Sequence, residues 1–362
     1  MSHLRTETVD DLPRLSVIVP CRDEELFISH CLDSILRNDY PADRMEIIVV
    51  DGMSVDGTSS IVSAYAQKYR FVTMLHNERQ ITPAGLNLGI ETSRGEVVCR
   101  IDAHARIAPD YLRRCVQSLL DTGADNVGGA MQTLPSNSTL SARSIALCMS
   151  HWFGVGNSNF RTGAGGPVFT DTVFGGCYRK AVFDRIGLFN ERLPRTQDIE
   201  FNQRLRGSGG RILLDPAIKC AYFASPTLKS FATHNFHDGI WSILPLAYSD
   251  VIPVRWRHLA AFAFVMILVV LGSFGIWFVP LRLALFLLVG GYFAVSIAFS
   301  SQLAFKKKNI LYLCSMPAVF AIRHFAYGVG SLCGAVTLGL NGSLRRILWR
   351  PAIDNSEPDH LA

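Results

Sequence analysis

Charged residues are scarce in one long part of this 362-residue sequence. Between positions 259 and 303 the only charged side chain is Arg282, whereas charged residues are spread through positions 1–258. A shift of this kind marks a change of solvent from water to lipid. We therefore divide the chain near position 250, which leaves one α/β domain of about 220 residues in the first part.

Closely spaced cysteine pairs and a leader segment are also missing. The nine cysteines occur singly, without a C-x-x-C pair, which excludes a disulfide-rich secreted scaffold and favours reduced core residues. The first residues, MSHLRTETVDDLPR, are polar and partly acidic, which excludes a cleavable signal peptide. We expect the first domain to stay in the cytosol.

A strong overall charge is absent as well, because the formal net charge is only +5. Much of the positive excess lies beside the apolar segments, at Arg255, Arg257, Lys306, Lys307, Lys308, Arg345, Arg346 and Arg350. This distribution favours anionic membrane lipid as a partner and argues against nucleic acid.

Two apolar segments predict a membrane hairpin. Residues 259–279 are uncharged and would rise about 31 Å as a helix, which matches a hydrocarbon core of about 30 Å. Residues 281–303 form a second span, and basic residues flank the pair on both sides, so the positive-inside rule places both flanks in the cytosol. We expect a multi-pass protein of the bacterial cytoplasmic membrane. Residues 310–340 predict either a third span or a kinked helix in the cytosolic interface.

The first part of the chain alternates between strand and helix patterns. Strands are predicted at 15–19, 46–50, 71–75 and 96–101, and helices at 24–36, 61–69, 83–91 and 111–120. Such alternation, with fully apolar strands, predicts a mostly parallel sheet covered by helices on both faces. Ligands bind outside the carboxyl ends of these strands, where Asp51, Asp102 and His104 stand. Asp23 and Asp56 lie at the same edge and could instead cap helices.

Four sequence segments carry a family resemblance: VIVPCRDEE at 17–25, IIVVDGMSVDGT at 47–58, DAH at 102–104 and TQDIEFNQRL at 196–205. Together they resemble glycosyltransferase family 2 over residues 14–225, and the wider pattern is similar to its exopolysaccharide, succinoglycan-type glucosyltransferases. The resemblance implies a GT-A nucleotide-diphospho-sugar transferase fold. The remaining predicted segments are a tail at 1–13, an interfacial linker at 226–258, a membrane region at 259–340 and a tail at 341–362.

The resemblance also implies a nucleotide pocket. It would be formed by Pro20, Arg22 and Glu24 after the first strand and by Asp51, whose carboxylate can accept the imide N–H of uracil. Asp102 would contact ribose and metal. Arg79 lies where the family often has a cation near the diphosphate or base, although a surface salt bridge explains it equally well.

The metal motif departs from the family pattern. Asp-x-Asp is usual at the fourth strand, whereas this chain has Asp102 and His104. The resemblance implies that both hold a divalent cation, and the imidazole favours Mn²⁺ over Mg²⁺. The alternative for His104 is a loop histidine that binds nothing.

The resemblance implies that Asp198 is the catalytic base, with Gln197 at the family's usual Glu position. A carboxylate at this place could also be only a helix N-cap. The acceptor site would include the small residues Gly175 and Gly176, with Arg179 and Glu200. The alternative for the glycines and Arg179 is a turn with solvated cations.

The predicted reaction is an inverting transfer of a hexose, with glucose expected, from a UDP-sugar to a polyprenyl-diphosphate-linked saccharide. Two alternatives remain. One is a processive polysaccharide synthase, although the Gln position of the motif Gln-x-x-Arg-Trp is Ile252 here. The other is a catalytically silent membrane scaffold that binds nucleotide sugar, which the unusual His104 and Gln197 make conceivable.

Overall fold

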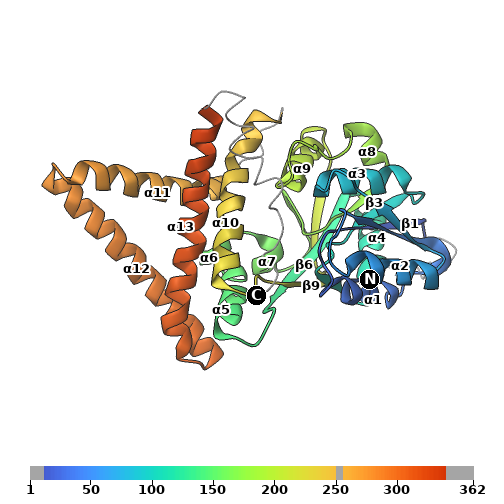
Figure 1. The fold of residues 1–362 in the computed structure, drawn as a ribbon, viewed down its shortest axis with the longest axis horizontal. Helices are drawn as coiled ribbons and strands as arrows, with labels where there is room; N and C mark the ends of the chain where they lie inside the picture. Colours follow the sequence, from blue (N-terminus) through green and yellow to red (C-terminus); the bar gives the residue numbers. More distant parts are fainter. Residues whose placement is uncertain (1–11, 250–255, 340–362) are drawn as a thin grey trace, which may run out of the picture. The chain divides into compact units, whose positions relative to one another are not determined.

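The computed structural model describes residues 12–249 and 256–339, which divide into two compact units. The sheet unit contains residues 12–132 and 163–222, and the helical unit contains 133–162, 223–249 and 256–339. Figure 1 shows strands and covering helices in the first unit and long helices in the second. Residues 1–11 of the predicted N-terminal tail, the predicted tail 341–362 with its basic residues, and Ile252 and Arg255 lie outside the described residues.

The first half of the sheet is the parallel arrangement that the sequence predicts. Its strands are in the order β3-β2-β1-β4, and all three pairings are parallel. Their bounds are β1 Leu15–Cys21, β2 Met45–Asp51, β3 Val72–His76 and β4 Val97–Arg100. The helices between and after them are α1 Ile28–Leu36, the short η2 Ala42–Arg44, α2 Thr58–Lys68, α3 Thr82–Thr92 and α4 Tyr111–Thr122.

The second half of the sheet is built by antiparallel pairing, which the strand pattern did not predict. β8 pairs antiparallel with both β4 and β6, and β9 pairs antiparallel with both β5 and β7. The bounds are β5 Ala105–Ile107, β6 Asn126–Leu134, β7 Val168–Phe169, β8 Cys177–Arg179 and β9 Ile212–Phe223. Three of these strands are only two or three residues long, so they carry too little periodicity to be recognised.

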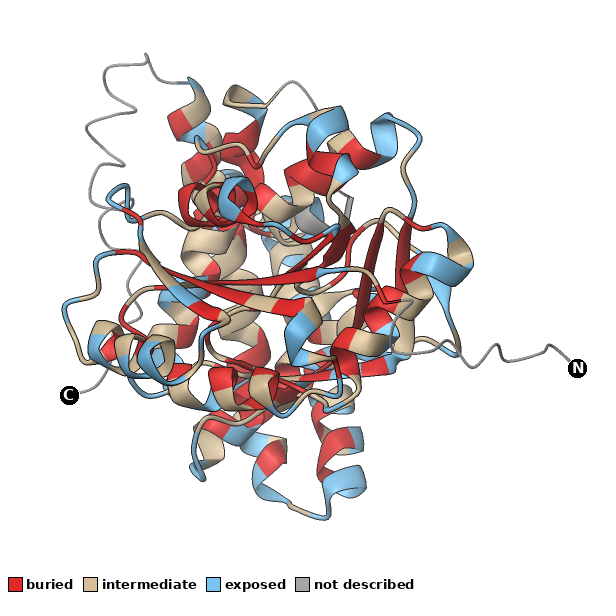
Figure 2. Cartoon of the chain, turned by 90° about the vertical axis from the view of Figure 1, so that its right-hand side faces the viewer, coloured by how far each residue is buried: buried red, intermediate tan, exposed pale blue. Residues whose placement is uncertain are grey.

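Packing of the sheet unit explains why its strands are apolar. Val17, Ile18 and Ile47 are completely or almost completely buried, and Figure 2 shows the central strands as a buried layer between partly exposed helices. Burying one such side chain contributes about 1.5–3 kcal/mol relative to leaving it exposed. Helix α3 approaches closely because Gly89 has no Cβ; one built there would lie 2.6 Å from Ile18 Cγ2.

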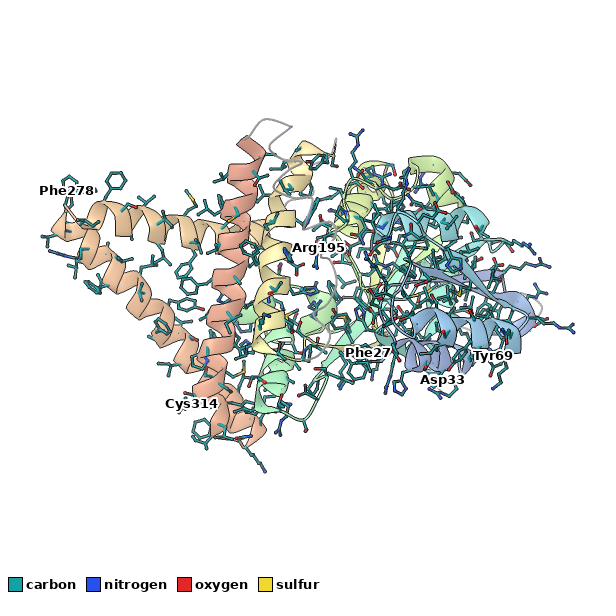
Figure 3. The ribbon with its side chains drawn as sticks, viewed as in Figure 1. Phe27, Asp33, Tyr69, Arg195, Phe278 and Cys314 are labelled. Atoms are coloured by element: carbon teal, nitrogen blue, oxygen red, sulfur yellow. The ribbon has the colours of Figure 1, made fainter. Side chains whose placement is uncertain are left out.

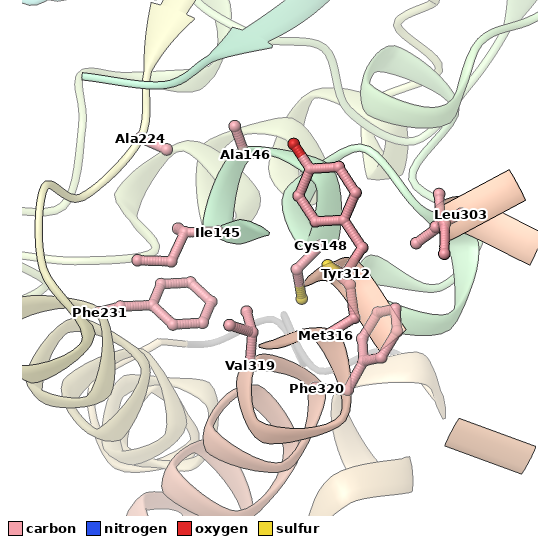
Figure 4. Close-up of a cluster of buried hydrophobic side chains, with 11 residues drawn as sticks. Ile145, Ala146, Cys148, Ala224, Phe231, Leu303, Tyr312, Met316, Val319 and Phe320 are labelled. Atoms are coloured by element: carbon pink, nitrogen blue, oxygen red, sulfur yellow. The ribbon is translucent and has the colours of Figure 1, made fainter. Parts of the chain in front are cut away.

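The helical unit has its own apolar core, which Figure 4 shows. Ile145 and Cys148 lie in it together with Met316 and Phe320. The segment 133–162, predicted as part of the 14–225 domain, clusters with this unit because of such contacts. The bounds are α5 Leu140–Met149, α6 Trp152–Val155, α7 Asn159–Thr162, α10 Leu228–Ile243, η3 Leu244–Ala247, α11 Trp256–Gly275, α12 Val279–Lys307 and α13 Leu311–Gly339.

Helices α10 and α13 lie side by side within the helical unit (Figure 1). Glycines allow their backbones to meet: a Cβ on Gly239 would lie 2.1 Å from Tyr327 O, and one on Gly330 would lie 2.0 Å from Phe236 O. Such small-residue contacts are typical of helices that pack in membranes. α10 lies within the segment 226–258 that is predicted as an interfacial linker.

Helices α11 and α12 cover the two segments, 259–279 and 281–303, from which a membrane hairpin is predicted. Phe278 at its tip is 57% exposed, and its side chain extends away from both helices in Figure 3. By length and composition, α12 and α13 could each cross a membrane, whereas Leu259–Gly275 of α11 is a shorter apolar helix. α13 continues through Pro317, so residues 311–339 form one helix.

Candidate functional site

The candidate site lies at the carboxyl edge of the parallel strands. Parallel pairing places Cys21 at the end of β1 opposite Asp51 of β2, and Asp51 opposite His76 of β3. β4 ends at Arg100, and the chain then turns through Asp102 to His104. The side chains that follow these strands therefore share one edge of the sheet, as the sequence predicts.

Asp102 is held by an arginine from the end of its own strand. Arg100 donates from Nε and Nη2 to Asp102 Oδ1, at 3.0 and 2.9 Å, and both side chains are largely buried. A charged donor pair of this kind fixes a carboxylate in one orientation. Because both contacts go to Oδ1, Asp102 retains a second oxygen for another partner.

His104 is oriented by a carboxylate from another loop. Its Nδ1 lies 2.7 Å from Glu24 Oε1, and its ring meets Tyr222 edge-on, with 5.0 Å between the ring centroids. Burial opposes the charged imidazole, but the Glu24 carboxylate outweighs it and raises the pKa of His104 to about 9. Without a competing ligand, this histidine is therefore a cation at neutral pH.

Asp198 stands in the first turn of helix α9, which runs from Gln197 to Gly207. The preceding residue Thr196 has φ +60° and makes no side-chain capping bond. Removal from water raises the pKa of the half-buried Asp198, and Arg100 opposes that rise. Asp102 and Asp198 in turn raise the pKa of Arg100 against its own burial, so the guanidinium lies within electrostatic reach of both carboxylates.

Asp51 is almost completely buried, with 1% of its surface exposed. Its carboxylate accepts hydrogen bonds from the hydroxyls of Ser54 and Ser59, each at 2.5 Å, and His76 Nδ1 lies 3.9 Å away. Four lone-pair sites allow a carboxylate to accept a further donor beside these bonds. The contacts fix the orientation in which Asp51 faces the edge of the sheet.

The loop after β1 joins the Asp51 and His104 parts of the site. Asp23, with φ +52°, accepts a bond from Val55 N, and its own N–H donates to Ser54, which also binds Asp51. The next residue, Glu24, binds His104. Asp56 accepts from Thr58 N at the start of α2, which agrees with the capping alternative for this residue.

The remaining predicted donor-pocket residues lie around the same loop. Pro20 is within β1, opposite Val50. Arg22 Nη1 lies 3.5 Å from Gln80 O. Arg79 pairs with Glu191 on the surface, which is the salt bridge given as the alternative for this arginine.

The glycine pair of the predicted acceptor site lies beside the end of β4. Gly175 and Gly176 have φ of +69° and +106°, a region that favours glycine, and Arg100 N donates to Gly176 O at 2.9 Å. A Cβ on Gly175 would lie 2.8 Å from Arg100 O. The turn therefore passes directly next to the residue that holds Asp102.

Arg179 and Glu200 are engaged elsewhere. Arg179 lies opposite Val97, at the amino end of β4, and donates to backbone oxygens of Leu119 and Ala124. Glu200 is buried and forms a two-bond ion pair with Arg204 within α9. The structure gives both residues contacts that hold elements together, and it does not bring Arg179 to the edge where Asp102 lies.

The described residues of the candidate site would supply only part of the ligands that a divalent cation needs. Among them, no group of three or more His, Cys, Asp and Glu side chains could hold a metal. Mg²⁺ and similar cations at phosphate sites use one or two protein ligands, with water and phosphate oxygens completing the shell. Asp102 Oδ2 and His104 Nε2 are the atoms that would supply such a pair, because Oδ1 and Nδ1 already have protein partners.

Comparison with known proteins decides the family. Residues 16–187 match the model described as "Glycosyl transferase family 2". This segment is a glycosyltransferase family 2 domain. The predicted resemblance is confirmed, and the enzyme class predicted from it is supported.

Two relatives of this chain are named for glycan synthesis. The chain is 28% identical to the succinoglycan biosynthesis protein ExoA of Rhizobium meliloti (strain 1021), over 72% of this chain and 84% of the relative. It is 27% identical to the dolichyl N-acetyl-alpha-D-glucosaminyl phosphate 3-beta-D-2,3-diacetamido-2,3-dideoxy-beta-D-glucuronosyltransferase of Methanococcus voltae, over 62% of this chain and 71% of the relative.

A solved structure confirms the predicted GT-A fold. It is the mannosyltransferase PcManGT from Pyrobaculum calidifontis in complex with GDP-Man and Mn²⁺, at a TM-score of 0.59 and 22% identity. The match covers 90% of this chain and 88% of that chain. At this identity the likeness establishes the fold of this chain and not its substrate.

Sequence reasoning missed Arg100 in the candidate site. Arg100 is the last residue of a strand whose other residues are apolar. The carboxylate nearest to it in the sequence is Asp102, two positions later. That spacing was a usable signal, because residues i and i+2 of an extended chain lie on the same side. The contact between Glu24 and His104 had no such signal, since 80 positions separate them.

Proposed function

We propose that this chain is an inverting glycosyltransferase that moves a hexose from a UDP-sugar to a saccharide carried on polyprenyl diphosphate at the membrane surface. The proposal is supported by one observation. At the edge where nucleotide-binding α/β sheets take their ligands, Arg100 forms an ion pair with Asp102, and Arg100 also opposes the rise that burial causes in the pKa of Asp198. Glucose is the first sugar to test, because a succinoglycan biosynthesis protein is among the relatives.

In the proposed reaction Asp198 acts as general base. It takes the proton of the acceptor hydroxyl as that oxygen forms a bond to the anomeric carbon, and the bond from that carbon to the diphosphate oxygen breaks. UDP leaves with the electron pair of the broken bond. A single displacement from the opposite face inverts the anomeric configuration, so one carboxylate base is sufficient.

Two other residues serve the same step. Arg100 favours the ionised form of Asp198, which is the form that can accept a proton. Asp51 would accept the imide N–H of uracil in place of the long bonds of 3.3 Å that the Ser54 N–H makes to both of its oxygens. Gly175 and Gly176 would let the acceptor sugar approach the backbone at the end of β4.

A divalent cation, Mn²⁺ in preference to Mg²⁺, would be held by Asp102 and His104 and would stabilise the negative charge of the leaving diphosphate. PcManGT was crystallised with Mn²⁺ and a nucleotide sugar, which supports a cation-dependent donor site in this fold. The donor set of one carboxylate and one imidazole suits Mn²⁺, since nitrogen ligands are poor partners for Mg²⁺.

The lipid-linked acceptor is supported by two features. The relative from Methanococcus voltae is named for a dolichyl phosphate-linked sugar. In this chain, α12 and α13 are long and apolar enough to cross a membrane. An anchor of this kind would keep the active site close to headgroups that carry the acceptor.

The test incubates the full chain in nanodiscs with a polyprenyl-diphosphate-linked saccharide as acceptor. Labelled UDP-glucose, UDP-galactose, UDP-N-acetylglucosamine and GDP-mannose are supplied in separate reactions. The lipid fraction is then extracted and its label is counted. We expect label in the lipid fraction from a UDP-sugar, with one sugar per acceptor. Asp198→Asn should reduce kcat by 10² to 10⁴ while UDP affinity stays within about twofold. The exposed Asp184→Asn on helix α8 (Ala181–Ile186) is the matched control.

Two outcomes would count against the proposal. Retention of full activity by Asp198→Asn would remove the assigned base, and loss of UDP binding in the same variant would indicate a structural role. No transfer from any nucleotide sugar by the wild-type chain would leave the silent scaffold as the better description. Long polymer on a defined acceptor would instead favour the processive alternative.

A further inference from the structure

Glu24 is a buried carboxylate whose position is fixed from two directions. Its backbone N–H donates to Thr58 Oγ1 at 2.8 Å, and its side chain is only 11% exposed. The neighbouring Glu25 contrasts with it, because that residue is exposed and its carboxylate accepts from Gly57 N at the surface. Burying a carboxylate is unfavourable unless it has a polar or charged partner.

The partner of Glu24 is the imidazole of His104. The distance of 2.7 Å between Glu24 Oε1 and His104 Nδ1 is that of a strong hydrogen bond in which Nδ1–H donates. A second contact limits rotation of the ring, since His104 meets Tyr222 at an interplanar angle of 75°. The next residue, Ala105, pairs with Tyr222 in the β5–β9 ladder, so backbone and ring are both anchored to β9.

This arrangement determines which ring nitrogen remains available. With Nδ1 engaged, the lone pair of a neutral His104 must be on Nε2. The His104 side chain is 31% exposed, so Nε2 can still reach a ligand outside the protein. A histidine that binds a metal through one nitrogen usually donates its other ring N–H to a carboxylate or carbonyl oxygen.

We propose that Glu24 is a positioning residue that orients His104 Nε2 toward the divalent cation of the donor complex. Glu24 was predicted to line the nucleotide pocket; in this assignment it acts through His104 and does not touch the nucleotide. The assignment rests on the proposed function, since it needs a cation at the Asp102–His104 pair. A carboxylate next to the diphosphate would repel it, whereas a carboxylate behind the imidazole strengthens the ligand.

The same contact has a purely structural reading, which a double-mutant cycle separates from the proposed role. If Glu24 only joins two loops, its removal affects folding and leaves cation affinity unchanged once the protein is folded. If it acts through His104, its effect on cation affinity disappears when His104 is absent. Coupling of this kind between two contacting residues is what a cycle measures.

The experiment measures Mn²⁺ affinity of the full chain in detergent or nanodiscs at saturating UDP, by the electron paramagnetic resonance signal of free Mn²⁺. The variants are Glu24→Gln, His104→Ala and the double variant, with Glu25→Gln as the matched control. We expect Glu24→Gln to weaken Mn²⁺ binding by about 10-fold to 100-fold. Glu25→Gln should leave it unchanged, and the double variant should bind Mn²⁺ as His104→Ala does.

A second measurement guards against loss of folding. UDP affinity in EDTA and Tm should be close to wild type for Glu24→Gln, because the amide keeps the size of the side chain and can accept the Nδ1–H. An equal loss of Mn²⁺ affinity from Glu24→Gln in the wild-type and His104→Ala backgrounds would overturn the assignment, as would weaker UDP binding in EDTA.

The outcome is separable from that of the proposed function. If the wild-type chain transfers sugar and the His104→Ala variant binds Mn²⁺ with wild-type affinity, the role of Glu24 is refuted. The proposed glycosyltransferase reaction then stands. A positive cycle in a chain that transfers no sugar would establish the Glu24–His104 pair as part of a cation site and count against the proposed reaction.

Discussion

The two units differ most in how their charged side chains are paired with side chains of opposite charge. In the sheet unit, carboxylates are paired with cations, as in Arg100–Asp102, Arg204–Glu200 and Arg185–Asp125. In the described part of the helical unit, Asp238 is the only acidic residue. The cations of that part are Arg143, Arg161, Lys229, Arg257, Arg282, Lys306, Lys307, Lys308 and Arg323.

Arg323 illustrates the consequence. Its guanidinium donates to the carbonyl oxygen of Gly154 and to the side-chain oxygen of Asn235, and it lies over the ring of Tyr327. All of these partners are neutral. Within residues 133–162, 223–249 and 256–339, one carboxylate is too few to neutralise these cations. Such an excess of positive charge suits contact with anionic lipid.

The largest expected effect is a loss of stability when the close backbone contact between α10 and α13 in the helical unit is blocked. Gly330→Leu should destabilise this unit by more than about 3 kcal/mol, because a Cβ there would collide with Phe236 O and force α10 and α13 apart. Gly290→Leu in α12 is the control, since its Cβ meets nothing within 4 Å. Thermal unfolding in detergent measures the difference, and UDP binding reports whether the sheet unit survives. Equal Tm values for both variants would show that the close approach is dispensable.

The next effect is a shift in the pH dependence of activity when the cation Arg100 of the sheet unit is removed. The base Asp198 must be ionised, so activity falls as pH drops through its pKa, which burial raises and Arg100 holds down. Arg100→Gln removes the opposing cation, so that pKa rises further. The acidic limb of kcat/KM should move to higher pH by on the order of one unit.

At neutral pH, Arg100→Gln should also lower kcat/KM by roughly 10-fold to 100-fold, because Asp102 loses the donor that orients it. Arg185→Gln, which breaks the exposed pair with Asp125, is the control and should leave the pH profile in place. A lower rate with an unmoved acidic limb would mean that Arg100 serves Asp102 alone.

Several parts of this site could be predicted from the sequence and others could not. Asp51 and Asp102 follow strands whose apolar residues are continuous, so their place at one edge follows from parallel topology alone. The antiparallel half depends on pairings between distant short strands, such as Cys99 with Cys177. Local periodicity carries no information about such pairings.

Residues with two local interpretations were the hardest to assign. Arg179 follows the glycine pair and looks like an acceptor-site cation, but the antiparallel register of β8 carries it to the amino end of β4. Residues 133–162 lie inside the predicted domain 14–225, whose bounds follow the extent of the family resemblance. Their apolar side chains pack instead with α13, and only the tertiary structure shows this.

A smaller effect is expected from the lysines at the end of α12. Lys306, Lys307 and Lys308 are all exposed, and changing them together to Gln should reduce the preference for spin-labelled phosphatidylglycerol over phosphatidylcholine. The expected loss is at most about 1 kcal/mol per lysine. Replacing the exposed sheet-unit residues Lys68, Arg70 and Arg94 by Gln is the matched control. The same loss in both triple variants would indicate that net charge, and not its location, sets the lipid preference.

The smallest effect is a difference in thiol reactivity between the units. Cys314, near the start of α13, is exposed and labelled in Figure 3, whereas Cys31, Cys99 and Cys115 of the sheet unit are completely buried. Burial also raises the pKa of the Cys31 thiol, which keeps it protonated and unreactive. In a Cys333→Ser background, maleimide should add once to the folded chain. Additional labelling should require unfolding.

The side from which Cys314 is labelled then tests the membrane arrangement. It follows Lys308 by six positions, so the positive-inside rule places it close to the cytosolic surface. An impermeant maleimide should modify it in inside-out vesicles and leave it free in right-side-out vesicles. Labelling from the outside would reverse the orientation of α12 and separate the lysines from the leaflet where the nucleotide sugar is available. The proposed reaction at a cytosolic site would then be untenable.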